Sequence, residues 1–367
     1  MRIVVTGATG FVGRYTVAAA LARGHRVAAV LRPASSGREL GPLLDHPGVE
    51  AVRVDLRSRA GLVDAVRGAD SVIHLAAAKS GDFYTQFAGT VVATENLLWA
   101  MGEAGVGQLV AVSTFSVYDY KSLDGGTLLT ETSPIDADPV KRDEYARTKL
   151  LQEELYREFG SHGAVPDPSP EAEPQAPEGR RAVIVRPGLI YGRDELWHAL
   201  LGAELGPRFL RVGAKATLPL LYVENCAEAL VLAAEKLAEN PSLVSGETIN
   251  LVDDDLPTQG RYVELVTAVM EPPPSLFVPW PVMRLAADAL DRANGLLLGG
   301  RAKFPGIVVP EKLHGRFKPL RYTNAKAKRL LGWTPRYGTE DAVRRAGGDA
   351  DLLSELASPA GSQRAHG

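Results

Sequence analysis

Short apolar runs alternate with amphipathic segments along the first half of the chain, and each change of pattern predicts a change of secondary structure. Apolar runs bounded by turn residues indicate buried strands, and longer stretches with helical periodicity indicate helices between them. The pattern predicts strands at 2–5, 26–31, 50–54, 71–75, 108–112 and 181–185, and helices at 14–23, 59–66, 87–104 and 143–159. Such alternation favours an α/β fold with a doubly wound parallel sheet.

The second half is expected to add a smaller C-terminal substrate domain. We expect a dinucleotide-binding domain over 1–194, to which 213–238 returns, and a mainly substrate-binding region over 195–337. Five prolines in 161–179 predict a mobile insertion. Residues 347–367 are rich in Gly, Ala and Ser and predict a flexible tail, with a short helical turn near 351–356.

The segment 279–298 is amphipathic, with Met283, Leu290 and Leu297 on one face and Arg284 and Asp288 on another. It is interpreted as a helix packed in the substrate domain or at a subunit contact. The alternatives are a helix on a membrane surface and a lid over a lipophilic substrate. The polar face is not rich in Lys and Arg, which disfavours the membrane.

Composition narrows the class of protein. The 367 residues are 45% hydrophobic and 23% charged, as is ordinary for a globular enzyme, and the net charge of −3 gives no reason to expect a nucleic-acid partner. The single cysteine, Cys226, cannot form an internal disulfide and is typical of a reducing compartment. With a core strand at the start and no apolar run long enough to span a bilayer, we expect a cytoplasmic protein without a signal peptide.

Gly7, Gly10 and Gly13 follow the first predicted strand at intervals of three residues, and a predicted helix comes next. In this order, the turn and the helix N-terminus present backbone N–H groups to a pyrophosphate. Glycines there permit the tight turn, the approach of the phosphates and close packing of helix on strand. The motif therefore predicts a dinucleotide-binding site.

Tyr145 and Lys149 lie four residues apart on a predicted helix, so both side chains share one face. A nearby cation is expected to lower the pKa of the phenol, which could then exchange a proton with an alcohol or ketone. Alone, this spacing is more typical of a solvated helix face. After a dinucleotide motif in the same α/β unit, the catalytic interpretation is favoured.

Two other polar groups lie at strand ends, where doubly wound sheets bind ligands. Thr114 is a candidate to hydrogen-bond a reacting oxygen, although Ser and Thr also occur there in ordinary turns. His74 is expected to pack and bond locally rather than act as a base, and Cys226 to be a small buried residue. Histidines do not cluster at metal-ligand spacing, so no metal site is predicted.

Taken together, the motifs resemble the extended short-chain dehydrogenase/reductase superfamily, in the branch described as NAD-dependent epimerases and dehydratases, with features similar to 3β-hydroxysteroid dehydrogenases. The resemblance covers most of 1–337 and implies a Rossmann-type fold. The motifs that carry it are 6–13, Asp55-Leu56, 74–77, 113–118, 145–149, 186–192, 222–225 and 317–322.

The resemblance implies roles for individual residues. Tyr145 would be the general acid/base, Lys149 would lower the pKa of Tyr145 and hold the nicotinamide ribose, and Thr114 would orient the substrate oxygen. The cofactor would be contacted by Gly7, Thr9, Gly10, Phe11, Val12, Gly13, Arg32, Asp55, Leu56, Ala76, Ala77, Lys79, Tyr145, Lys149, Pro187 and Gly188.

Arg32 follows the second predicted strand, where NAD-specific sites place an acidic residue. An arginine there can pair with the 2′-phosphate of NADP. NADP(H) is therefore favoured and NAD(H) remains the alternative, since Arg32 could also lie on the surface beside a site that accepts both.

Departures from the family pattern narrow the substrate. Phe115 and Ser116 stand where sugar-nucleotide dehydratases carry an Asp-Glu pair, which disfavours dehydration. Leu218 stands where sugar-nucleotide epimerases place an arginine for the substrate pyrophosphate, although Arg211 and Lys215 are near enough in sequence to compensate. These features favour a lipophilic or otherwise uncharged alcohol or ketone.

The sequence thus predicts an NAD(P)-dependent oxidoreductase that acts on a small-molecule secondary alcohol or ketone. One alternative is a nucleotide-sugar epimerase with a tightly bound, recycled NAD. Another is a non-catalytic nucleotide sensor, which the presence of Tyr145, Lys149 and Thr114 disfavours. The resemblance implies a homodimer formed through helices 87–104 and 143–159.

Overall fold

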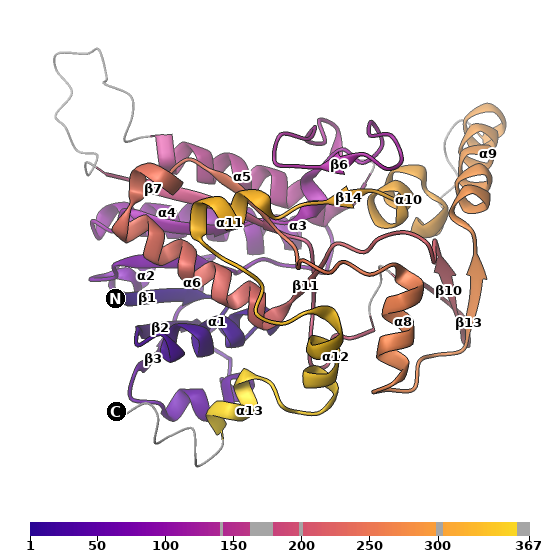
Figure 1. Ribbon diagram of the computed structural model, residues 1–367. Helices are drawn as coiled ribbons and strands as arrows, with labels where there is room; N and C mark the ends of the chain where they lie inside the picture. The colour runs from indigo at the N-terminus through magenta and orange to yellow at the C-terminus, as the bar shows by residue number, and fades with distance from the viewer. Residues whose placement is uncertain (140–141, 162–178, 198–200, 299–303, 358–367) are drawn as a thin grey trace.

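A seven-stranded parallel sheet forms the centre of the protein, here described from a computed structural model that covers residues 1–139, 142–161, 179–197, 201–298 and 304–357 (Figure 1). Its strand order is β12-β7-β5-β4-β1-β2-β3. These strands are β1 Arg2–Thr6, β2 Arg26–Leu31, β3 Val49–Arg53, β4 Ser71–His74, β5 Gln108–Val112, β7 Arg181–Pro187 and β12 Thr248–Leu251.

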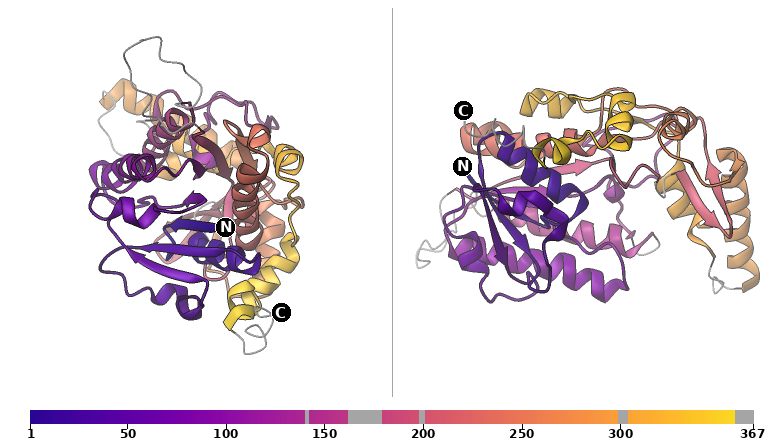
Figure 2. Two further views of the ribbon diagram at one scale, coloured as in Figure 1. Left: turned by 90° about the vertical axis from the view of Figure 1, so that its left-hand side faces the viewer. Right: turned by 90° about the horizontal axis from the view of Figure 1, so that it is seen from below.

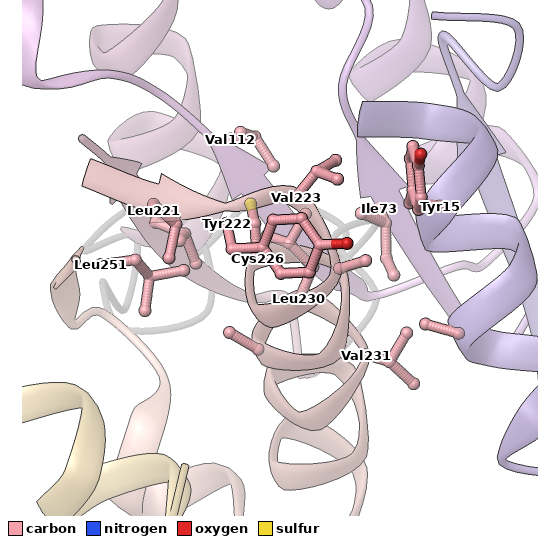
Figure 3. Close-up of a cluster of buried hydrophobic side chains, with 14 of the residues drawn as sticks. Tyr15, Ile73, Val112, Leu221, Tyr222, Val223, Cys226, Leu230, Val231 and Leu251 are labelled. Atoms are coloured by element: carbon pink, nitrogen blue, oxygen red, sulfur yellow. The ribbon is translucent and has the colours of Figure 1, made fainter. Parts of the chain in front are cut away.

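Helices cover both faces of this sheet, and β1, β4 and β5 are accordingly buried along nearly their whole length, with apolar side chains at most positions of β1 and β5. One core joins the sheet to α1 Phe11–Ala22 and α6 Val223–Glu239, and Figure 3 shows side chains of α1, β5 and α6 meeting in it. The second core joins the opposite face to α2 Leu62–Val66, α4 Ala93–Glu103 and α5 Glu144–Ser161. The predicted doubly wound parallel sheet is confirmed.

Most predicted elements appear within a few residues of the expected bounds, with two differences. The helix expected at 87–104 starts earlier, as α3 Phe83–Phe87, and continues through a π-helical stretch, Ala88–Val92, into α4. The seventh strand, β12, was not predicted; it is short and pairs with β7 at the sheet edge. The proline-rich segment 162–178 lies outside the described residues.

A smaller unit lies at the end of the molecule remote from the N-terminus (Figures 1 and 2). It contains a three-stranded sheet of β9 Gly202–Leu205, β10 Arg208–Val212 and β13 Ser275–Val278. Beside this sheet lie α9 Trp280–Leu298 and α10 Pro310–Phe317. The remaining elements are β6 Leu128–Leu129, β8 Leu189–Tyr191, β11 Leu220–Tyr222, β14 Arg321–Tyr322, α7 Pro241–Val244, α8 Gln259–Thr267, α11 Ala325–Leu331, α12 Thr339–Gly347 and α13 Leu352–Ala357.

The amphipathic segment 279–298 is helical, as predicted, and uses only part of its apolar surface for packing. Met283 and Ala287 are buried against Leu313 and Phe317 of α10. Leu296 and Leu297 are among the most exposed apolar side chains, at 87% and 80%. Among the helices of the described residues, none has both the length and the apolar character needed to cross a membrane.

The C-terminal part returns to the large sheet further than the sequence predicted. Within the stretch assigned to the substrate region, β12 completes the large sheet and Trp333 is buried in the core beside α6. The expected flexible tail includes α13, which packs on α1. Asp351 is fully buried there and accepts a hydrogen bond from the Tyr15 hydroxyl and an ion pair from Arg193. These contacts hold the segment that leads into α13 against α1.

Asn225 fastens this returning segment to the cofactor-binding unit. Its amide donates to Asp253 at 2.8 Å and to the Tyr337 carbonyl at 2.9 Å. Its side-chain oxygen accepts from the backbone N–H groups of Arg336 and Tyr337. Since Asn225 is fully buried, each of these partners would lose a bond without replacement by water if the amide were removed.

Replacing Asn225 with alanine should therefore lower the free energy of unfolding by about 2–4 kcal/mol. Urea unfolding followed by circular dichroism measures this loss. Asn240→Ala is the matched control, because Asn240 is exposed and its side chain accepts a local bond from Ser242. Equal stability of the two variants would contradict the role given to Asn225.

Candidate active site

The predicted site residues gather at the carboxyl edge of the large sheet. The strand order reverses between β1 and β4: the chain continues from β1 to β2 and β3 on one side, and from β4 to β5 and β7 on the other. Such a switch point leaves a crevice where nucleotides bind in doubly wound folds. The predicted residues reach this edge from the ends of β1, β2, β3, β4, β5 and β7, and from α5.

The glycine turn between β1 and α1 has the backbone shape that a pyrophosphate site needs. Gly7 has a φ of +68°, and a Cβ on it would lie 3.0 Å from the Ala76 nitrogen. A Cβ on Gly13 would lie 2.1 Å from the Gly7 carbonyl oxygen, so only glycine lets α1 approach the turn. Gly10 caps α1 without a side-chain hydrogen bond, and the first turn holds no acidic residue. The N-terminal N–H groups of α1 therefore suit an anion.

The residues predicted around the adenosine lie after β2 and β3. Arg32 is exposed directly after β2, while Asp55 and Leu56 are half-buried after β3. Hydrogen bonds from Arg57 hold the pKa of the Asp55 carboxyl below its ordinary value, and the charge of Arg32 adds to this effect. Arg32 and Asp55 are thus neighbours, and Arg32 presents a cation beside the edge of the crevice.

The other predicted cofactor residues line the same edge. Thr9, Phe11 and Val12 belong to the glycine turn and the start of α1, and all are half-buried. Ala76, Ala77 and Lys79 follow β4, with Lys79 exposed. Pro187 ends β7, and a Cβ on Gly188 would lie 2.3 Å from the Pro219 carbonyl oxygen, so the chain passes close to the segment before β11.

Tyr145 and Thr114 lie close together near the end of β5. Tyr145 is in the first turn of α5, near enough to Thr114 for that side chain to lower the pKa of the phenol. Burial is the larger effect and raises the pKa of Tyr145 to about 12, with a further rise from the Asp143 charge. Thr114 caps a short helical turn and accepts from the Ser116 N–H at 3.2 Å. The two predicted catalytic side chains are therefore close to each other near the end of β5.

Lys149 lies one turn further along α5 and is turned toward the sheet. Its ammonium donates to the Val112 carbonyl at 2.7 Å and to Gln152 Oε1 at 2.5 Å. Burial lowers the pKa of Lys149 to about 7, with Glu153 opposing and Lys79 adding to the shift. Lys149 is not among the causes that shift the pKa of Tyr145 here, and its ammonium faces Val112 and Gln152. The role expected for Lys149 toward Tyr145 stays a prediction.

A buried ion pair between Glu153 and Arg186 lies one helical turn after Lys149 on α5. Glu153, fully buried, accepts two hydrogen bonds from the Arg186 guanidinium at 2.8 and 2.7 Å, and a third from the Ser113 hydroxyl. Burial would raise the pKa of Glu153, but the bonds and charge of Arg186 hold it below its ordinary value. The guanidinium also stacks on Tyr118, 4.9 Å from the ring centre. The pair fastens α5 to the ends of β5 and β7.

Two residues judged structural from the sequence are structural. His74 is completely buried and bonded to Thr6 and Thr94, and burial lowers its pKa to about 3, so the ring stays neutral. Cys226 is buried in α6, where burial raises the pKa of its thiol far above the ordinary value. His74 is therefore too weak a base, and Cys226 too weakly ionised to be a nucleophile, at neutral pH.

Sequence reasoning missed the buried partners of the catalytic pair. Gln152 and Glu153 lie three and four residues after Lys149, so helix geometry could have placed them on its face. Thr94 and Arg186 come from α4 and β7, and no local pattern pairs them with α5. On the substrate side, Leu218 is buried, while Arg211 is half-buried and its Nε has no hydrogen-bond partner within the described part of the chain.

Comparison with known proteins extends these observations. The model of the NAD dependent epimerase/dehydratase family matches residues 3–251. The chain is 27% identical over 359 residues to sterol-4-alpha-carboxylate 3-dehydrogenase, decarboxylating, of Bos taurus, covering 93% of this chain and 90% of the relative. It is 29% identical over 359 residues to 3 beta-hydroxysteroid dehydrogenase/Delta 5-->4-isomerase of Mycobacterium tuberculosis, covering 93% and 88%.

Among solved structures, the fold is similar to UDP-glucose-4-epimerase from Stenotrophomonas maltophila with bound NAD and formylated UDP-arabinopyranose. The TM-score is 0.69 at 21% identity, covering 98% of this chain and 100% of that one. This likeness shows a shared fold. The family match covers more than half of the chain, together with the glycine turn and the Tyr145/Lys149 helix. The chain therefore belongs to the NAD dependent epimerase/dehydratase family, within the extended short-chain dehydrogenases/reductases, and is an NAD-dependent oxidoreductase or epimerase.

Proposed function

We propose that this protein is an NAD(P)-dependent oxidoreductase that interconverts a secondary alcohol and a ketone, with Tyr145 as general acid/base. The observation that carries the proposal is the proximity of the Tyr145 and Thr114 side chains near the end of β5. These side chains lie at the same carboxyl edge of the sheet as a glycine turn whose shape suits a dinucleotide.

The ionisation of Tyr145 favours the reductive direction. With a pKa of about 12, Tyr145 carries its proton at neutral pH and can give it to a ketone oxygen as that oxygen gains negative charge. Thr114 holds the same oxygen by a hydrogen bond and so fixes the carbonyl. The nicotinamide, when bound, supplies the hydride. The ammonium of Lys149 adds positive charge to the site when it is protonated.

Leu218 and the relatives support a proposal for the substrate class. Leu218 is buried and apolar where a pyrophosphate-binding arginine would favour a nucleotide sugar. Two relatives that align over nearly the whole chain are named for sterol and steroid substrates. We therefore propose a lipophilic alcohol or ketone. The exposed Arg32 supports a preference for NADP(H). We further propose that the protein is cytoplasmic and forms a homodimer.

A nucleotide-sugar epimerase is the second candidate, and Arg211 is the observation that favours it. This arginine lies in the small sheet on β10, half-buried, and burial lowers its pKa. A cation so placed suits an anionic substrate group. Conversion of a UDP-sugar into its epimer, without net oxidation or reduction of added cofactor, would support this candidate against the first.

Replacing Tyr145 with phenylalanine should lower turnover of a ketone substrate by about 10²–10⁴-fold, because the proton donor is lost. Binding of NADPH, measured by fluorescence titration, should stay nearly unchanged. Tyr84→Phe is the matched control, since Tyr84 is 79% exposed and should tolerate loss of its hydroxyl. Substantial turnover in the Tyr145 variant would remove the assignment of the general acid.

Replacing Arg32 with alanine should weaken NADPH by about tenfold to a hundredfold, as expected for loss of one charge-assisted hydrogen bond, and leave NADH nearly unaffected. Calorimetric titration measures both affinities. Arg38→Ala removes another exposed arginine a few residues further along and should change neither affinity. An equal loss for both nucleotides in the Arg32 variant would refute recognition of the 2′-phosphate.

A further inference from the structure

A row of buried polar side chains connects the glycine turn to Lys149. It runs from Thr6 at the end of β1 through His74, Thr94 and Gln152 to Lys149. Lys149 is 3% exposed, Thr94 and Gln152 are fully buried, and the five residues of the row come from four elements, β1, β4, α4 and α5. Polar groups buried in this way must satisfy one another, so their hydrogen-bond directions are constrained.

The directions follow from Thr94, which has a single proton to give. Its hydroxyl donates to the Thr90 carbonyl at 2.6 Å. The Thr94 oxygen must therefore accept from Gln152 Nε2, at 2.7 Å, and from His74 Nε2, at 2.9 Å. His74 thus carries its proton on Nε2, and its Nδ1 accepts from the Thr6 hydroxyl at 2.6 Å.

The chain of bonds reaches the cofactor edge through Thr6. The Thr6 oxygen accepts from the backbone N–H groups of Leu75 and Ala76, at 3.2 and 3.3 Å. These residues begin the loop that contacts Gly7. A single tautomer of His74 therefore connects the loop after β4 to Thr94.

At the Lys149 end of the row, the single hydroxyl proton of Thr94 also determines the orientation of the Gln152 amide. Its NH2 group has to face Thr94, because Thr94 has no second proton to offer an oxygen. Its Oε1 must then face Lys149, where it accepts from the ammonium at 2.5 Å. The Val112 carbonyl takes a second ammonium proton at 2.7 Å. Gln152 is held in one of its two amide orientations, the one that accepts from Lys149.

We infer that Gln152 is a positioning residue for Lys149, and that Thr94 and neutral His74 hold Gln152 in the orientation that accepts from the ammonium. The inference deepens the proposed function, since it rests on Lys149 belonging to the active site. It adds Gln152, Thr94 and His74 as residues that affect the reaction by positioning Lys149.

The charge state of Lys149 should respond to Gln152, because little else near it favours the cation. Burial lowers the pKa of Lys149 to about 7, Glu153 opposes this shift and Lys79 adds to it. Glu153 is itself held by Arg186. The titratable or charged groups around Lys149 are Tyr145, Glu153 and Tyr156 on α5, His74 on β4, Lys79 after β4, and Arg186 on β7.

The test is a pH titration of Lys149 in the protein without added nucleotide. NMR of 13Cε-labelled lysines monitors the titration. The Lys149 signal is assigned by its loss in Lys149→Met. Gln152→Met keeps the side-chain volume and removes the acceptor, so the titration should move to lower pH by about one unit. Gln152→Glu places a negative charge at the same position and should move it to higher pH.

Gln259→Met is the matched control, because Gln259 is equally buried and its amide donates to Leu201 and Val212, away from Lys149. It should leave the Lys149 titration unchanged, whatever it does to stability. Shifts of opposite sign in the two Gln152 variants support the inference. Should Gln152→Met not fold, the Gln152→Glu titration decides alone.

An unchanged titration in the Gln152 variants would overturn the inference. This readout needs no substrate, so it is independent of the proposed function, which turnover and Tyr145→Phe test. In the active enzyme, Gln152→Met should also lower kcat and move the alkaline limb of its pH profile downward, with little change in the KM for the ketone.

Discussion

The buried polar face of α5 imposes the strictest physical constraint on this protein. Lys149, Gln152 and Glu153 are all withdrawn from water, and an unpaired charge or amide in such a place would cost several kcal/mol. Each therefore needs a partner from the sheet or from α4. Glu153 binds Arg186 at the end of β7, and Lys149 binds the last carbonyl of β5. These bonds hold α5 against the carboxyl edge of the sheet and so place Tyr145 beside Thr114.

The same constraint explains why the pKa values of Tyr145 and Lys149 differ from what their spacing in the sequence suggests. A lysine four residues from a tyrosine lowers the phenol's pKa only when its charge faces the phenol. Here the ammonium is engaged by Val112 and Gln152, and burial dominates both groups: the pKa of Tyr145 rises and that of Lys149 falls. Tyr145 is therefore suited to donate a proton, which fits reduction of a ketone.

The sequence was sufficient for the parts of the structure that depend on local pattern. The apolar runs located six of the seven strands of the large sheet. The glycines at 7, 10 and 13 predicted a turn that does not tolerate a Cβ at Gly13. It did not predict what depends on contacts between distant segments. β12 is too short to be recognised alone, Asp351 is held by Tyr15 from the other end of the chain, and Thr94 meets Gln152 across two helices.

We propose that the protein uses its nucleotide as a dissociable substrate in net oxidation and reduction. Native mass spectrometry of the purified chain, followed by titration with NADPH and NADH, tests it most directly. We expect a chain that binds nucleotide reversibly and prefers NADPH. One tightly retained NAD per chain would contradict it, because a cofactor recycled within each turnover is the mark of an epimerase.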